Sequence, residues 1–147
     1  MMLQVVPATT YLIYRHFYDP KTQQLMLGGI ENYLLQLARL LQSEGQRCVV
    51  VQTADQDFIA CFQGIDVIGV HCGVNRGNRK KLALFQYISS RFNDETDSII
   101  FGTDSYHVKN NFRRSIAIQH GVSWDKPASG SVFGFIKSLL SHQKYLN

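Results

Sequence analysis

Three short polar clusters in this 147-residue sequence contain residue types that bind ligands or take part in catalysis. The clusters are Gly28-Gly29-Ile30-Glu31, Gly102-Thr103-Asp104 and His120-Gly121. A glycine pair destabilises a helix interior, but at a helix entrance it lets backbone N–H groups approach an anion closely. The stretch at Gly28 and Gly29 is therefore either a plain turn into a helix or a place where a negatively charged group binds.

His120 follows a short apolar run and precedes a glycine. A histidine at the end of a buried strand can hydrogen-bond a sugar hydroxyl or a phosphate, or serve as a general base. The alternative is a histidine that caps the strand edge and satisfies backbone groups of the loop. The remaining histidines show no metal-ligand spacing, so we expect no metal site. They are His16, His71, His107 and His142.

The elements that must position these clusters follow from hydrophobic periodicity. Apolar residues recur at helical spacing from Ile30 to Leu41, and Gly45 follows where a C-cap glycine is usual. Residues 79–92 predict a second helix. Apolar runs without helical period predict strands within 3–17 and over 47–53, 65–72, 98–103 and 115–121. This alternation predicts an α/β fold, a Rossmann-like parallel sheet flanked by helices, whose strands carry all three polar clusters to one edge.

The composition narrows the classes of partner. An excess of four positive charges and a pI near 9.1 suit an anionic partner. The sequence has no G-x-G-x-x-G fingerprint, and the basic loop 73–80 does not match a Walker A motif. It shows neither a stacking-platform motif nor a recognition helix, so we expect no nucleic-acid partner.

The cysteines and the apolar stretches indicate the cellular compartment of the protein. Three cysteines without a CxxC pair indicate a reducing compartment. No apolar stretch approaches the roughly 20 residues that cross a bilayer, and no signal peptide is recognisable, so we predict a cytoplasmic protein. Residues 131–147 form a basic amphipathic pattern that either packs on the sheet or an adjoining domain, or touches the inner face of the membrane.

The segment GGIENYLLQLARLLQSEGQRCVVVQT resembles the start of the N-terminal domain of the glycosyltransferase family 4 enzymes, which are retaining sugar transferases of the GT-B fold. The segments IDVIGV, DSIIFGTDSYH and SIAIQHGVSWD continue the resemblance in the same order, over residues 25–147. The resemblance implies an acceptor-side domain that works with a nucleotide-sugar as co-substrate and needs no other cofactor. A second Rossmann-like domain holds most of that donor in the family.

The resemblance also implies roles for individual residues. Gly28 and Gly29 present backbone N–H groups to the diphosphate of the donor, and His120 approaches the transferred sugar as the catalytic residue. The implied acceptor contacts are Glu31, Tyr106 and His107. Glu31 has the alternative role of a first-turn carboxylate favoured by the helix dipole.

The sequence departs from the family pattern at its end, because it stops before the remaining strands of such a domain. We therefore interpret residues 1–147 as a single, incomplete N-terminal domain. A missing C-terminal domain or a second polypeptide would complete it, and the chain alone would be inactive. The expected acceptor is a sugar or a lipid-linked glycan. The alternative function is a non-catalytic Rossmann-like domain that binds a nucleotide or another anionic ligand.

Overall fold

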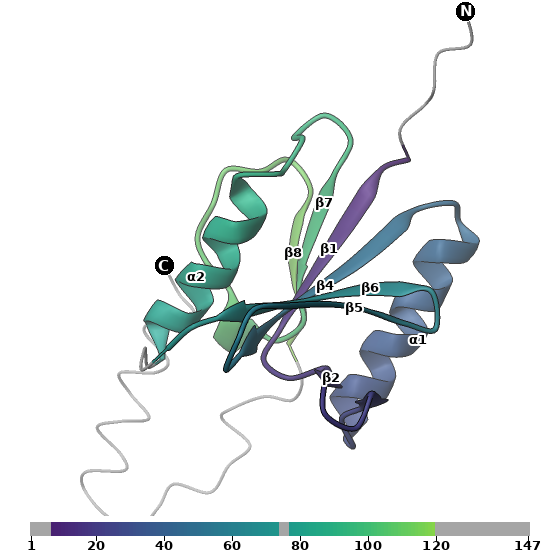
Figure 1. Ribbon diagram of the computed structural model, residues 1–147. Helices are drawn as coiled ribbons and strands as arrows, with labels where there is room; N and C mark the ends of the chain where they lie inside the picture. Colours follow the sequence, from purple (N-terminus) through teal and green to yellow (C-terminus); the bar gives the residue numbers. More distant parts are fainter. Residues whose placement is uncertain (1–6, 74–76, 120–147) are drawn as a thin grey trace, which may run out of the picture.

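The computed structural model describes residues 7–73 and 77–119, which form a six-stranded sheet flanked by helices (Figure 1). The strand order is β5-β6-β4-β1-β7-β8, and every neighbouring pair is parallel except β5 with β6. The elements are β1 (Thr9–Tyr14), α1 (Gly29–Ser43), β4 (Arg47–Ala54), β5 (Phe58–Phe62), β6 (Ile65–His71), α2 (Asn78–Ser89), β7 (Ser98–Phe101) and β8 (Ser115–Ala117). The sequence prediction of a Rossmann-like α/β sheet is confirmed at this level.

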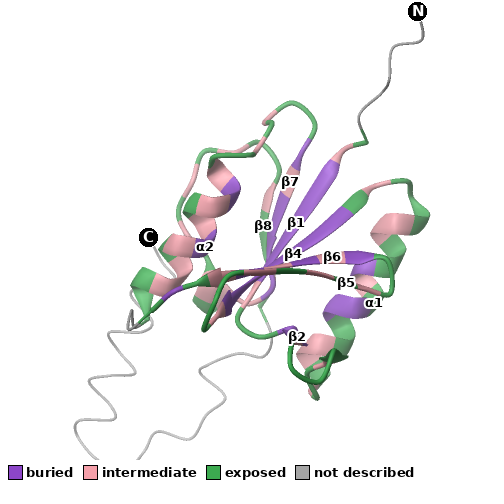
Figure 2. Cartoon of the chain, viewed as in Figure 1, coloured by how far each residue is buried: buried purple, intermediate pink, exposed green. Residues whose placement is uncertain are grey.

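The sheet carries a hydrophobic core on each face because successive residues of a strand point to opposite sides. In β4, Cys48 and Val50 belong to the core under α1, whereas Val49 and Val51 belong to the core under α2. The central strands are accordingly buried along most of their length (Figure 2). This double burial explains why these strands are continuous apolar runs in the sequence.

Helix α1 has the predicted amphipathic face. Leu34, Leu35 and Ala38 are its buried residues. The backbone reaches the left-handed region at Gly45, with φ of 79°, directly after the helix cap. Glycine adopts this conformation without steric cost, so the predicted helix end is confirmed.

The connections create a topological switch point beside β1. The chain passes from β1 through α1 to β4 on one face, and from β6 through α2 to β7 on the other (Figure 1). Gly102, directly after β7, donates its N–H to the Ile13 carbonyl oxygen at 2.7 Å. A side-chain carbon at Gly102 would lie 2.9 Å from that oxygen and 3.1 Å from Leu34 Cδ1. The ends of β1 and β7 therefore pack tightly against α1.

Several details differ from the sequence prediction. The segment before the glycine pair contains a small hairpin, β2 (Tyr18–Asp19) and β3 (Gln24–Leu25). Strand β5 is an antiparallel edge strand that the sequence prediction did not include. The second helix ends at Ser89 rather than at residue 92, and β8 has only three residues. The pattern at 131–147 lies outside the described residues.

Candidate functional site at the carboxyl edge of the sheet

The predicted glycine pair lies at the start of α1. Gly28 precedes the helix in an extended conformation, with φ of 172°, so its backbone does not require glycine. A side-chain carbon added at Gly29 would meet no atom within 4 Å. The backbone of Gly29 is therefore open to a ligand at the positive end of the helix dipole.

Glu31 occupies the first turn of α1, close to Gly28. A side-chain carbon at Gly28 would collide with the Glu31 carboxylate, which also accepts a 2.9 Å hydrogen bond from the Tyr14 hydroxyl. Burial, and next this hydrogen bond, raise the pKa of Tyr14 to about 12. Glu31 lies in the first turn of α1, where the helix dipole favours a carboxylate, and its side chain covers Gly28. Gly29 is the accessible member of the pair.

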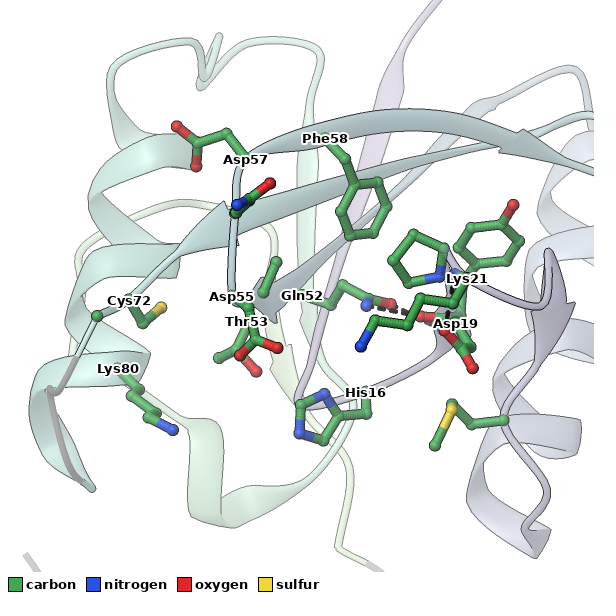
Figure 3. Close-up of a pocket in the computed structure, with 16 residues that line it drawn as sticks. His16, Asp19, Lys21, Gln52, Thr53, Asp55, Asp57, Phe58, Cys72 and Lys80 are labelled. Carbon is green, nitrogen blue, oxygen red and sulfur yellow. Dashed lines mark hydrogen bonds between the residues drawn. The ribbon is translucent and has the colours of Figure 1, made fainter.

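A pocket of about 820 Å³ lies at the carboxyl ends of β4 and β6 (Figure 3). The β2–β3 hairpin forms one side, and the first turn of α2 contributes Lys80 on another. Ligands in open α/β sheets bind at this edge. The charged or strongly polar residues that line the pocket are His16, Asp19, Lys21, Gln52, Thr53, Asp55, Gln56, Asp57 and Lys80.

Gln52 and Thr53 hold the chain after β1 against the end of β4. The Gln52 side chain is 2% exposed, and its Oε1 accepts hydrogen bonds from the backbone N–H groups of Phe17 at 3.0 Å and Tyr18 at 2.8 Å. Its Nε2 donates to the Tyr18 carbonyl oxygen at 2.8 Å. Thr53 Oγ1 donates to the Arg15 carbonyl oxygen at 2.9 Å. These bonds position residues 15–18 and hence the hairpin side of the pocket.

His16 lies in the segment that follows β1, and it lines the pocket. Its pKa is lowered, first by partial burial and then by the charges of Arg15 and Lys80. Asp55 and Glu31 act in the opposite direction with smaller effects. The imidazole is therefore neutral at neutral pH, so it can either donate or accept a hydrogen bond.

Two lysines and one aspartate face the pocket without ion pairs. Figure 3 shows the side chains of Lys21, Lys80 and Asp55 directed into the pocket from different sides. In residues 7–73 and 77–119, the ion pairs within 4.0 Å are Arg47–Asp66 and Arg113–Asp94, both outside the pocket. The charges of these three side chains are thus available to a ligand.

The other two carboxylates of the pocket have structural partners. Asp57 Oδ1 accepts the backbone N–H of His71 at 2.6 Å, and its side chain turns away from the centre of the pocket (Figure 3). Asp19 Oδ1 accepts the backbone N–H of Lys21 at 2.9 Å, and this bond is the main reason for its lowered pKa. Asp55 is therefore the carboxylate that the centre of the pocket presents to a ligand.

The predicted acceptor contacts after β7 lie outside this pocket. Tyr106 belongs to a short 3-10 helix, η1 (Asp104–Tyr106), and packs against the core under α2. Burial raises the pKa of Tyr106, and the positive charge of Arg15 opposes that rise. His107 packs edge-to-face on Phe101, with ring centroids 5.0 Å apart. His120 and Gly121 lie outside the described residues.

The structure brings two of the three predicted clusters to one edge, because Gly102 packs against Leu34 of the helix that Gly29 begins. The sequence reasoning did not identify the pocket residues His16, Lys21, Asp55 and Lys80. A usable signal was present for Asp55, because Gln52-Thr53-Ala54-Asp55 directly follows a buried apolar run. Ligands of open α/β sheets bind beyond the carboxyl ends of the strands, and this principle, which pointed to Gly102, points to Asp55 as well.

In the described part of the chain, no group of three His, Cys, Asp or Glu side chains is arranged to hold a metal ion. No helix there is long and apolar enough to cross a bilayer. No family model, curated protein or solved structure matches this chain. Two features of the chain therefore bear on its function: the geometry of the sheet edge and the residues that carry the resemblance.

Proposed function

We propose that this chain is the acceptor-side domain of a GT-B glycosyltransferase, part of an enzyme that transfers a sugar from a nucleotide-sugar to a glycan or lipid-linked acceptor. The observation that carries the proposal is the shared edge. A helix with an accessible glycine at its start and a large pocket lined by charged side chains both lie at the carboxyl edge of this sheet. A donor diphosphate and an acceptor hydroxyl must meet at such an edge for transfer to occur.

The proposal assigns the two parts of the edge to the two substrates. The N–H groups at Gly29 contact the diphosphate. When the bond between the sugar and the diphosphate breaks, the diphosphate keeps the electron pair and becomes more negative, and N–H hydrogen-bond donors stabilise this added charge. The pocket beside His16 receives the acceptor. The role of His120 in fixing the transferred sugar follows from the family resemblance. The donor-binding wall comes from a second domain or a second polypeptide, so the isolated chain is inactive.

The test compares Gly29→Asp with Gly29→Ala. Both side chains enter open space, and an acidic residue in the first helical turn is favourable, so both variants should fold. The aspartate places a negative charge where the diphosphate would lie, whereas the alanine adds only a methyl group. We expect extracts of cells that produce Gly29→Asp to lose sugar transfer by at least about tenfold relative to Gly29→Ala, which corresponds to about 1.4 kcal/mol.

Equal transfer by the two variants would exclude Gly29 from the donor site. Turnover by the purified wild-type chain alone would contradict the half-enzyme interpretation. The alternative function, a non-catalytic domain for an anionic ligand, is favoured by the unpaired lysines of the pocket. It predicts ligand binding by the purified chain, with no loss of sugar transfer from cell extracts when the chain is removed.

A further inference from the structure

Lysines lie at the sides of the pocket with His16 and Asp55 between them, while the other two carboxylates of the pocket, Asp19 and Asp57, accept backbone N–H groups. Lys21 comes from the β2–β3 hairpin and Lys80 from the first turn of α2, on different sides of the pocket (Figure 3). His16 and Asp55 come from the ends of β1 and β4. We propose that this pocket binds an anionic sugar, with hydroxyl groups at Asp55 and His16 and negatively charged groups at Lys21 and Lys80.

The lysines argue for negative charges on the ligand. Each ammonium group belongs to a separate segment of the chain, and neither forms an ion pair with a described residue. Lysine binds phosphate or carboxylate as a point charge with three rotatable donors. The two lysines reach the pocket from different sides. A ligand that binds both of them therefore carries two anionic groups, one at each end.

Asp55 argues that these anionic groups are attached to a hydroxyl-rich body. A carboxylate accepts hydrogen bonds from adjacent hydroxyls, but it repels a free anion. His16 supplies one donor or acceptor beside it. Phe58, which is half-buried, also lines the pocket and offers an apolar surface to the carbon face of a sugar ring. A sugar with phosphate or carboxylate substituents fits this combination, whereas a simple anion does not.

The pocket is positioned before any ligand arrives. The Gln52 amide fixes the backbone of Phe17 and Tyr18, and Asp57 anchors the end of β6 through the N–H of His71. These bonds hold the walls from which Lys21 and Asp55 extend. A preformed pocket lowers the entropy cost of binding, so a small ligand should bind with measurable affinity.

The test is calorimetric titration of the full 147-residue chain with four probes: glucose, glucose 6-phosphate, glucose 1,6-bisphosphate and inorganic phosphate. We expect the affinity to rise by about fivefold or more with each phosphate on the sugar, as for a partly exposed ion pair. Lys21→Gln and Lys80→Gln should each remove the gain in affinity that one phosphate contributes. The matched controls Lys81→Gln, from the neighbouring position of α2, and Lys109→Gln should bind like wild type.

Asp55→Asn supplies the sharpest readout because its effects should have opposite signs. It should weaken glucose by about fivefold, because a neutral amide oxygen accepts hydrogen bonds from hydroxyls less strongly than a carboxylate does, and it should strengthen inorganic phosphate, through loss of repulsion. The proposal is overturned if the bisphosphate binds no better than inorganic phosphate, or if the Lys81 variant weakens it as much as the Lys80 variant.

A further measurement distinguishes a soluble sugar from a membrane surface. If the chain co-sediments with phosphatidylglycerol vesicles, and Lys21→Gln and Lys80→Gln abolish this without affecting the sugar phosphates, the lysines contact a membrane and the sugar assignment fails. Only the description of this ligand as the acceptor depends on the proposed function. The two experiments have independent outcomes. The sugar phosphates can bind even if the Gly29 variants transfer sugar equally well, and they can fail to bind even if those variants differ.

Discussion

The buried amide of Gln52 offers a demanding test of how the pocket is held together. Gln52→Leu keeps the approximate volume but leaves two backbone N–H groups and one carbonyl oxygen, at Phe17 and Tyr18, without their partners. Both residues are buried, at 0% and 6% exposure, so water cannot readily replace the amide. An unsatisfied buried group costs about 1–3 kcal/mol, so three of them should lower the free energy of unfolding by at least about 3 kcal/mol.

The assay is urea unfolding of the full chain followed by far-UV circular dichroism. A loss of about 3 kcal/mol is a large share of the roughly 5–15 kcal/mol that stabilises a typical domain. Gln36→Leu, an exposed position on α1, is the matched control and should change stability by no more than about 0.5 kcal/mol. Hydrogen exchange should also show faster exchange of the Phe17 and Tyr18 amides in Gln52→Leu.

A loss below about 1 kcal/mol in Gln52→Leu would refute the reasoning, because three hydrogen bonds would then contribute less than one usually does. If Gln52→Leu fails to fold, Thr53→Val tests the same junction more gently. It removes only the 2.9 Å bond from Thr53 Oγ1 to the Arg15 carbonyl oxygen. We expect a loss of about 1 kcal/mol from that change.

Three further predictions follow from individual side chains. Cys61 is exposed and Cys48 is buried with its pKa raised to about 12, so a thiol reagent should label Cys61 quickly in the native protein and Cys48 only after unfolding; rapid native labelling of Cys48 would contradict the burial. Tyr14→Phe removes the hydroxyl bonded to Glu31 and should cost about 1 kcal/mol in urea unfolding, and in the wild type the Tyr14 phenol should ionise only near pH 12. The pKa of His16 is lower in the folded than in the unfolded chain, so the unfolded state binds more protons and stability falls as the pH drops below about 6.5; His16→Gln should flatten that part of the pH–stability curve, and an unchanged slope would refute the assignment.

Much of the fold could be predicted from the sequence because its signals are local. The helical spacing from Ile30 to Leu41 and the glycine at 45 defined α1 closely, and the apolar run at 47–53 defined β4. Strand β5 was missed although its five residues are all apolar; it is an edge strand, and its Ile59 and Cys61 are exposed. The β2–β3 hairpin was missed because each of its strands has only two residues.

The candidate site was less predictable because its parts are distant in sequence. The glycine pair was recognisable from its residue types, yet only the structure shows that the Glu31 carboxylate covers Gly28 and that Gly29 is open. Tyr106 and His107 were chosen from their place after a predicted strand. In the structure Tyr106 packs against the core under α2, and His107 packs on the ring of Phe101.

The sequence by itself determined the order and type of the main elements, because hydrophobic period and β-branched runs act over a few neighbouring residues. The tertiary structure decided which polar side chains share a pocket. Gln52 reaches backbone groups 34 and 35 positions earlier in the chain, and Lys80 lines the same pocket as the hairpin because β1, β4 and β6 end at the same edge of the sheet. Such contacts depend on strand order and on burial of the whole sheet, and no local pattern specifies either of them.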